Sequence, residues 1–324
     1  MPTTALIPLE NITPTVSTNV ITIVQLVYGI PSLVLMIAFF FVLGCSKTYE
    51  SSFYRLVQLD LLTNILCYTN TWIAMRFDKQ PSGVATLKMI ESALPGLLDF
   101  TKVLTRFFMH MQFSSTVALS LHRITAAMFY LKYEKAWSKF YPLFAIFCVI
   151  YSSLPSLWYF EKHYKFQITN GTLTGTLFLE ATNRSIAQTA IFSVIYFVLL
   201  LLVGVVTVEL ITRKMRIVNS NTSEVSKKLT RIAVTYCSVY SGILLLSVFS
   251  AINNVFSWIP AFIIDFYPTI LLFCSDMMTL ALPYILLVHD ANVRRDLLRV
   301  FGRQETAGTT GAFVSVTSTQ QRNP

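Results

Sequence analysis

The sequence predicts an all-α membrane protein, a bundle of seven transmembrane helices with its N-terminus outside and its C-terminus inside. The 324-residue chain is 54% hydrophobic and only 13% charged, whereas soluble proteins carry about 25% charged residues. A hydrocarbon core about 30 Å thick needs a helix of about 20 apolar residues. Runs of that length lie at residues 21–43, 56–75, 99–124, 140–159, 186–208, 232–257 and 266–288.

The positions of the basic residues predict the orientation. Cytoplasmic loops are enriched in Lys and Arg, and most of the 25 such residues fall in segments that are inside if the N-terminus is outside. These segments are residues 44–55, 122–139, 212–231 and 289–324. The Asn-X-Ser/Thr sequons at Asn11, Asn170 and Asn183 fall on the outer side, where glycosylation is expected.

The chain divides into one membrane domain, residues 21–288, and three smaller segments. Residues 1–20 are expected to form an extracellular tail. Residues 289–302 carry apolar residues on one helical face and Arg on the other, which predicts a short amphipathic helix on the inner leaflet. Residues 303–324 are rich in Thr, Ser, Gly and Gln and are expected to be a disordered cytoplasmic tail.

Two outer loops are long, residues 76–98 and 160–185. The second contains the run from Thr169 to Thr172 with Asn-Gly at its centre. Asn-Gly is a strong turn signal, so this loop is expected to carry an exposed turn or hairpin.

Four ionisable residues at the start of the third span form a candidate ligand site. They are Asp99, Lys102, Arg106 and His110, and spacings of three and four residues put them on one helical stripe. Arg can bind a carboxylate or sulfate with two hydrogen bonds, which predicts an outer pocket for a polar or anionic ligand. The alternative is that Asp99 pairs with Lys102 or Arg106, and that the long side chains extend to the membrane surface.

Two carboxylates and an amide are candidates for a polar network in the inner half of the bundle. Asp60 and Asn64 lie four residues apart in the second span, and Asp276 lies in the last span. Carboxylates in the membrane face the bundle and find polar partners, so this set is expected to rearrange on activation. Static hydrogen bonding between helices is an equal alternative. Pro283, near the inner end of the last span, is the candidate hinge.

The chain resembles the nematode serpentine chemoreceptors of class gamma, the Srg family, within the wider pattern of G-protein-coupled receptors. The resemblance runs up to about residue 301, and three regions carry it. They are residues 28–33 (YGIPSL), residues 52–57 (SFYRLV), and the pair 122–125 (HRIT) and 133–137 (YEKAW). One departure from rhodopsin-type receptors is His122, which stands where an acidic residue usually precedes the Arg.

The resemblance implies a chemosensory receptor in the plasma membrane of sensory cilia. It implies a small environmental or pheromone-like ligand and a heterotrimeric G protein as partners. The sequence has no phosphate-binding Gly-rich loop, no HExxH motif and no clustered Cys/His set, so neither catalysis nor a cofactor or metal is expected. The expected G-protein contacts are Arg123, Arg213, Lys214, Lys227 and Lys228. The alternative for Arg123 is that it anchors the helix at the inner face, and for the loop residues binding of anionic lipid head groups is an adequate alternative.

Two other classes of function stay open at this point. A ligand-gated channel or transporter would need a continuous polar lining, and the first, fourth, fifth and sixth spans contain no Asp, Glu, Lys or Arg. A seven-span membrane protein without signalling activity is the other alternative, and an intracellular location would support it.

Overall fold

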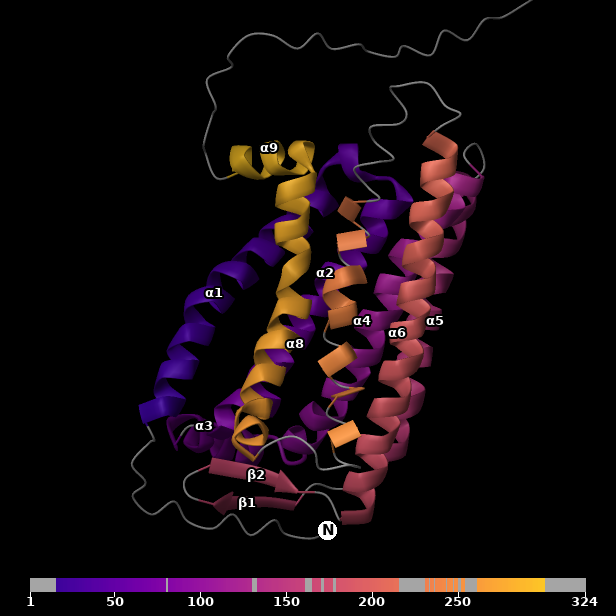
Figure 1. Cartoon of the computed structure of the whole chain (residues 1–324). Coiled ribbons are helices and arrows are strands. Elements are labelled where there is room, and N and C mark those ends of the chain that lie inside the picture. Colours follow the sequence, from indigo (N-terminus) through magenta and orange to yellow (C-terminus); the bar gives the residue numbers. More distant parts are fainter. Residues whose placement is uncertain are drawn as a thin grey trace, which may run out of the picture.

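The structure is a computed structural model that describes most of the chain. The described residues are 16–79, 81–129, 133–160, 165–169, 172–176, 179–215, 231–232, 234–235, 237–242, 244–246, 248–249, 252–253 and 261–300. Long helices run side by side in one bundle (Figure 1). They are α1 (Val16–Cys45), α2 (Ser52–Thr71), α4 (Leu97–Met128), α5 (Tyr133–Phe160), α6 (Leu179–Met215) and α8 (Ala261–His289). The predicted span at 232–257 is described only as short helical pieces.

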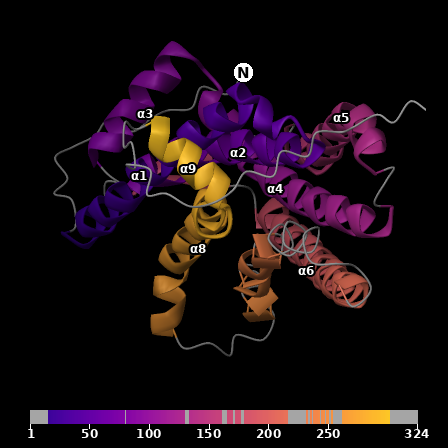
Figure 2. The same ribbon diagram turned by 90° about the horizontal axis from the view of Figure 1, so that it is seen from above.

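Within the described residues, four helices are both long and apolar enough to cross a membrane. They are Val20–Cys45, Tyr133–Leu157, Ala187–Leu210 and Thr269–His289. The helices α2 and α4 have 20 and 32 residues, but they carry more of the buried polar side chains. Seen along the bundle (Figure 2), α4 lies beside α2, α5 and α6, and it contacts all three. Many of the buried polar residues therefore lie on two helices, α2 and α4, that contact each other.

The two ends of the bundle carry different small elements. The helix α9 (Ala291–Val300) lies across one end, and the helix α3 (Pro81–Ala93) and a β-hairpin lie at the other (Figure 1). The hairpin pairs β1 (Lys165–Thr169) with β2 (Thr172–Thr176) in antiparallel register, with Thr169 opposite Thr172. The expected hairpin is confirmed. Residues 76–98, which were expected to be a loop, are largely helical.

The start of α4 depends on a glycine and a glutamate. Gly96 has φ +88°, a conformation that a residue with a Cβ rarely adopts. The Glu91 side chain at the end of α3 accepts hydrogen bonds from the backbone N–H groups of Gly96 (2.7 Å) and Leu98 (3.0 Å). These N–H groups have no partner inside the helix, so Glu91 fixes where α4 begins.

The end of α2 departs from regular α-helix. The π-helical turn η2 (Trp72–Arg76) follows α2 directly, and the N–H of Phe77 bonds the carbonyl of Trp72 five residues earlier. The 3-10 turn η3 (Phe77–Lys79) then leads towards α3. A π turn inserts an extra residue and rotates the side chains that follow. Arg76 consequently lies inside the bundle, 3% exposed, although it marks the end of the predicted span.

The apolar core and the apolar surface divide as expected for a membrane bundle. One cluster of buried residues, including Phe39, Leu61, Phe113 and Leu286, joins α1, α2, α4 and α8. Large apolar side chains on α5 and α6 are exposed, as with Leu154 at 61%. An exposed apolar face of this kind is suited to hydrocarbon.

Candidate functional site

A buried polar network joins α2, α4 and α8. The Asn64 amide donates a hydrogen bond to the Asp60 carboxylate (3.0 Å), and the Ser115 hydroxyl donates to the other oxygen of Asp60. The Gln112 amide donates to the side-chain oxygens of Asn64 (2.7 Å) and Thr279 (3.1 Å). Asp60 and Asn64 are fully buried. Hydrogen bonds among buried groups are costly to leave unmade, so a change at one residue is felt by the others.

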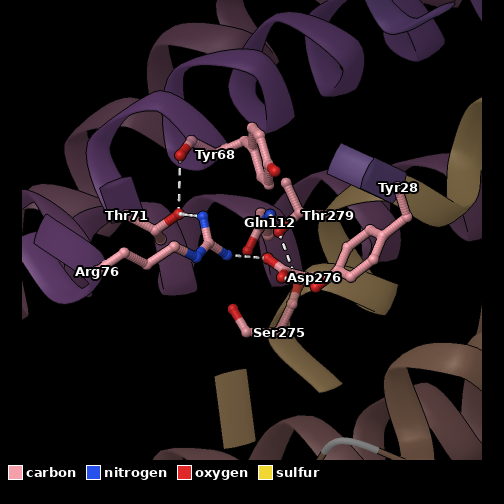
Figure 3. Close-up of polar contacts among 8 residues, drawn as sticks. All are labelled: Tyr28, Tyr68, Thr71, Arg76, Gln112, Ser275, Asp276 and Thr279. Carbon is pink, nitrogen blue, oxygen red and sulfur yellow. Dashed lines mark hydrogen bonds and ion pairs between the residues drawn. The ribbon is translucent and has the colours of Figure 1, made fainter. Parts of the chain in front are cut away.

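One turn from Thr279 on α8, Asp276 pairs with a different set of residues. One carboxylate oxygen forms an ion pair with Arg76, and the other accepts a hydrogen bond from the Tyr28 hydroxyl. Arg76 and Asp276 are 3% and 2% exposed. Figure 3 shows Asp276 between Arg76 on one side and Tyr28 on the other. The cluster therefore ties α1 and the end of α2 to α8.

Neighbouring side chains hold the Arg76 guanidinium in place. It lies 4.9 Å from the ring centroid of Tyr68 and 4.8 Å from that of Trp72, and it donates a 3.0 Å hydrogen bond to Thr71. Aromatic faces attract cations, more strongly where both are desolvated. Arg76 was not predicted as a site residue, because hydropathy does not reveal a π turn. The available signal was Asp276, since a lone carboxylate in a membrane span requires a polar or cationic partner.

The structure brings together part of the predicted polar network. Asp60 and Asn64 bond directly, as their four-residue spacing indicates. None of the hydrogen bonds described above joins Asp276 to Asp60 or Asn64. Asp276 is connected to them along α8, because Thr279 bonds Gln112, which bonds Asn64. The sequence analysis also missed Gln112, although an uncharged amide inside a membrane helix is itself a signal for a buried hydrogen bond.

The residues of the predicted stripe on α4 have different neighbours. The Lys102 ammonium bonds the backbone carbonyl of Ala74 in η2 and lies 3.3 Å from the Asp78 carboxylate. His110 lies two turns along the helix and faces α5 and α6. Its Nδ1 is 2.7 Å from the Tyr196 hydroxyl. The pairing of Lys102 with Asp78 differs from the alternative in which Lys102 pairs with Asp99.

Aromatic rings surround His110. Phe192 lies edge-on to the imidazole at 4.7 Å between ring centroids, and Tyr151 bonds Tyr196 at 2.8 Å between hydroxyl oxygens.

Asp99 and Arg106, the other two residues of the stripe, are both partly exposed.

At the end of the bundle that carries α9, α2, α4 and α5 meet through a second buried network. The carboxylate of Glu134 accepts hydrogen bonds from the Ser52 backbone N–H (2.6 Å) and hydroxyl (2.9 Å). The Ser52 hydroxyl has a single proton, so its 2.7 Å bond with His122 is donated by Nε2 of the ring. Glu134 thereby caps the first turn of α2 and fixes His122 through Ser52.

Arg123 is buried at this same end of the bundle. It is 6% exposed, and its guanidinium carbon lies 3.5 Å from the ring centroid of Phe53. Among the described residues, its Nε and Nη2 atoms have no hydrogen-bond acceptor. Arg123 is consequently not available at the surface in this arrangement, and contact with a partner would require its release from Phe53.

The other predicted site residues are described in part. Arg213 is exposed and pairs with Glu209 on the same helix at 2.6 Å. Pro283 is buried within α8. Lys214 and Asn183 lie in α6, where only their backbone is described. The other predicted residues lie outside the described residues: Asn11, Asn170, Lys227 and Lys228.

Two tyrosines attach the helix α9 to its end of the bundle. Asp290 accepts hydrogen bonds from the Val293 N–H at the start of α9 (3.2 Å) and from the Tyr54 hydroxyl (2.7 Å). Tyr49 donates to Asp296 at 2.8 Å. Burial, and then this hydrogen bond, raise the pKa of Tyr49 above its ordinary value, so the phenol keeps the proton that it donates.

Comparisons with known proteins agree with this architecture. The model of the Srg family chemoreceptors matches residues 22–297. Serpentine receptor class gamma-47 of Caenorhabditis elegans is 35% identical over 276 residues, which cover 85% of this chain and 89% of the relative. Serpentine receptor class gamma-53 of the same species is 26% identical over 275 residues, covering 85% and 90%.

Among solved structures, the crystal structure of squid rhodopsin matches with a TM-score of 0.66 at 9% identity. The match covers 94% of this chain and 93% of that chain. This likeness confirms the seven-transmembrane fold that the sequence predicts, and the family match confirms the resemblance. The chain belongs to the Srg family of chemoreceptors.

Proposed function

We propose that this chemosensory receptor binds a small molecule between the outer halves of its helices and activates a heterotrimeric G protein at the opposite end. In this proposal the β-hairpin and α3 face outside, and α9 lies on the inner leaflet. The excess of basic residues at the α9 end supports this orientation. Glycans at Asn11, Asn170 and Asn183 would mark the outer side.

The observation that carries the proposal is the set of buried polar contacts on α2, α4 and α8. Arg76 and Asp276 occupy one level of the bundle, and Thr279, Gln112, Asn64 and Asp60 continue inwards from there. Polar groups in the membrane are costly and mark functional sites. A ligand that favours one arrangement of these helices shifts the population of that arrangement.

The α4 stripe is the proposed contact for a polar or anionic ligand. Arg106 and His110 are its most suitable members, because Lys102 already has Asp78 and a backbone carbonyl as partners. His110 adds a hydrogen-bonding group beside the rings of Phe192 and Tyr196. Asp99 would set the local charge at the outer rim.

The inner ends of α4 and α6 are the proposed G-protein surface. Arg123 would leave Phe53 in the signalling arrangement and become accessible. Arg213 is already exposed, and Lys214, Lys227 and Lys228 extend the basic surface. Glu134, Ser52 and His122 would hold Arg123 in the resting arrangement.

Nucleotide exchange on a G protein tests the proposal. Membranes that carry the full chain are challenged with pooled small polar metabolites of nematodes, and Arg123→Ala is compared with Arg213→Ala at equal surface expression. We expect a response that Arg123→Ala abolishes and Arg213→Ala reduces only in part. A wild-type response that Arg123→Ala leaves intact would contradict the proposed role of Arg123, and ligand-evoked current without a G protein would favour a channel.

A further inference from the structure

Three buried hydrogen-bond donors between α1, α2 and α8 have no acceptor among the described residues. They are Nε2 of Gln25, the hydroxyl of Tyr68 and Nε of Arg76. The three side chains are 2%, 2% and 3% exposed. A buried donor without an acceptor costs the full desolvation of that group, so folded proteins rarely keep one without a reason.

The three donors belong to one region of the bundle. The Arg76 guanidinium carbon is 4.9 Å from the centroid of the Tyr68 ring. The Tyr68 hydroxyl reaches the backbone of α1 at Gly29, where an added Cβ would overlap it and would lie 2.9 Å from Cζ of the ring. Gln25 lies one turn before Gly29 on the same face of α1. Figure 3 shows Tyr68 and Arg76 on the same side of Asp276.

The chemistry of this cluster limits what could bind there. Each of the three groups carries a proton that has no acceptor, although the Tyr68 oxygen itself accepts from the side chain of Trp72. A ligand must therefore offer an acceptor. The charges of Arg76 and Asp276 already balance, and a further carboxylate would add an uncompensated buried charge. The surroundings are aromatic, since the rings of Tyr28 and Phe273 lie 5.9 Å apart and Trp72 covers Arg76.

We propose that the Gln25, Tyr68 and Arg76 donors form a second binding site, which takes an uncharged, largely apolar molecule through a carbonyl oxygen, as in an ester or ketone. This site is distinct from the α4 stripe. It rests on the proposed function only in that the chain is a receptor for small molecules. The π turn η2 supports the assignment, because such turns are frequent at functional sites.

Thermal unfolding of the purified full chain in lipid nanodiscs tests the site directly. The probe is methyl octanoate, which is uncharged and has a carbonyl acceptor. The controls are the octanoate anion, which is charged, and nonane, which has no acceptor. We expect methyl octanoate to raise the Tm by about 2–4 °C at saturation, and octanoate and nonane to leave it unchanged. No shift with methyl octanoate, or an equal shift with nonane, would overturn the proposal.

Two tyrosine substitutions separate a ligand site from a structural role. Tyr68→Phe removes one of the three donors and keeps the ring, so the methyl octanoate shift should be lost. Tyr49→Phe is the matched control, because Tyr49 is 1% exposed and has its acceptor, Asp296, at 2.8 Å. It should lower the Tm and keep the shift.

A methyl octanoate shift that survives Tyr68→Phe would overturn the site, and so would a shift that Tyr49→Phe also abolishes. Neither result depends on a G protein, so failure of this site and failure of the proposed coupling are distinguishable.

Discussion

Breaking the Arg76–Asp276 pair should destabilise the bundle far more than breaking an exposed pair. Arg76→Gln leaves the carboxylate of Asp276 buried with only Tyr28 as a strong donor, and Asp276→Asn leaves the guanidinium buried without its counter-charge. Removing one partner of a buried pair costs about 3–5 kcal/mol. At about 1.4 kcal/mol per tenfold change, the folding equilibrium falls at least a hundredfold.

A double-mutant cycle in nanodiscs measures this coupling. The double variant Arg76→Gln with Asp276→Asn leaves two neutral groups that can bond each other, so it should cost much less than the sum of the single variants. Arg213→Gln is the control, because the Arg213–Glu209 pair has side chains 76% and 58% exposed and should contribute less than about 0.5 kcal/mol.

The result that would refute this reasoning is additivity. If the two single costs sum to the cost of the double variant, the two charges do not interact in the folded chain. Single costs no larger than that of Arg213→Gln would show that Arg76 and Asp276 reach water in the native bundle. Either result would also remove Arg76 from the proposed second site.

Three further substitutions test local contacts. Gly29→Ala should destabilise the bundle by about 1–3 kcal/mol, because the added Cβ would overlap the Tyr68 hydroxyl. Tyr68→Phe should restore more stability in the Gly29→Ala background than in the wild type. Equal effects in the two backgrounds would contradict the contact between Tyr68 and Gly29. Glu134→Gln should speed hydrogen exchange at the Ser52 amide by about fivefold, because a charged cap is worth about 1 kcal/mol. Asp290→Ala should speed exchange in the first turn of α9, and protection as in the wild type would show that Asp290 does not cap that helix.

Much of the fold could be predicted because hydropathy and charge act over whole segments. The spans at 21–43 and 266–288 fall inside α1 and α8, and the Asn-Gly turn identified the hairpin. The helix α3 was missed because Pro81 and its flanking polar residues resemble a loop, whereas packing of Val84 and Leu87 against Leu98 of α4 stabilises it.

The candidate site was harder to predict, since its partners are distant in sequence. The Asp60–Asn64 bond follows from helical periodicity. The partners of Asp276 lie about 200 and 248 residues away, and a π turn decides which way Arg76 points. The α4 stripe follows from helical periodicity, whereas the contacts of Lys102 with Ala74 and Asp78, and of His110 with Tyr196, could not be read from the sequence.

The most direct test of the account is nucleotide exchange with Asp60→Asn. This isosteric change removes the charge that Asn64 and Ser115 solvate, and it keeps an acceptor for one of them. With receptor at equal surface density, the account predicts that the ligand-dependent rate falls to the basal rate while the chain stays folded. A ligand response equal to that of the wild type would contradict the claim that the buried polar network carries the signal.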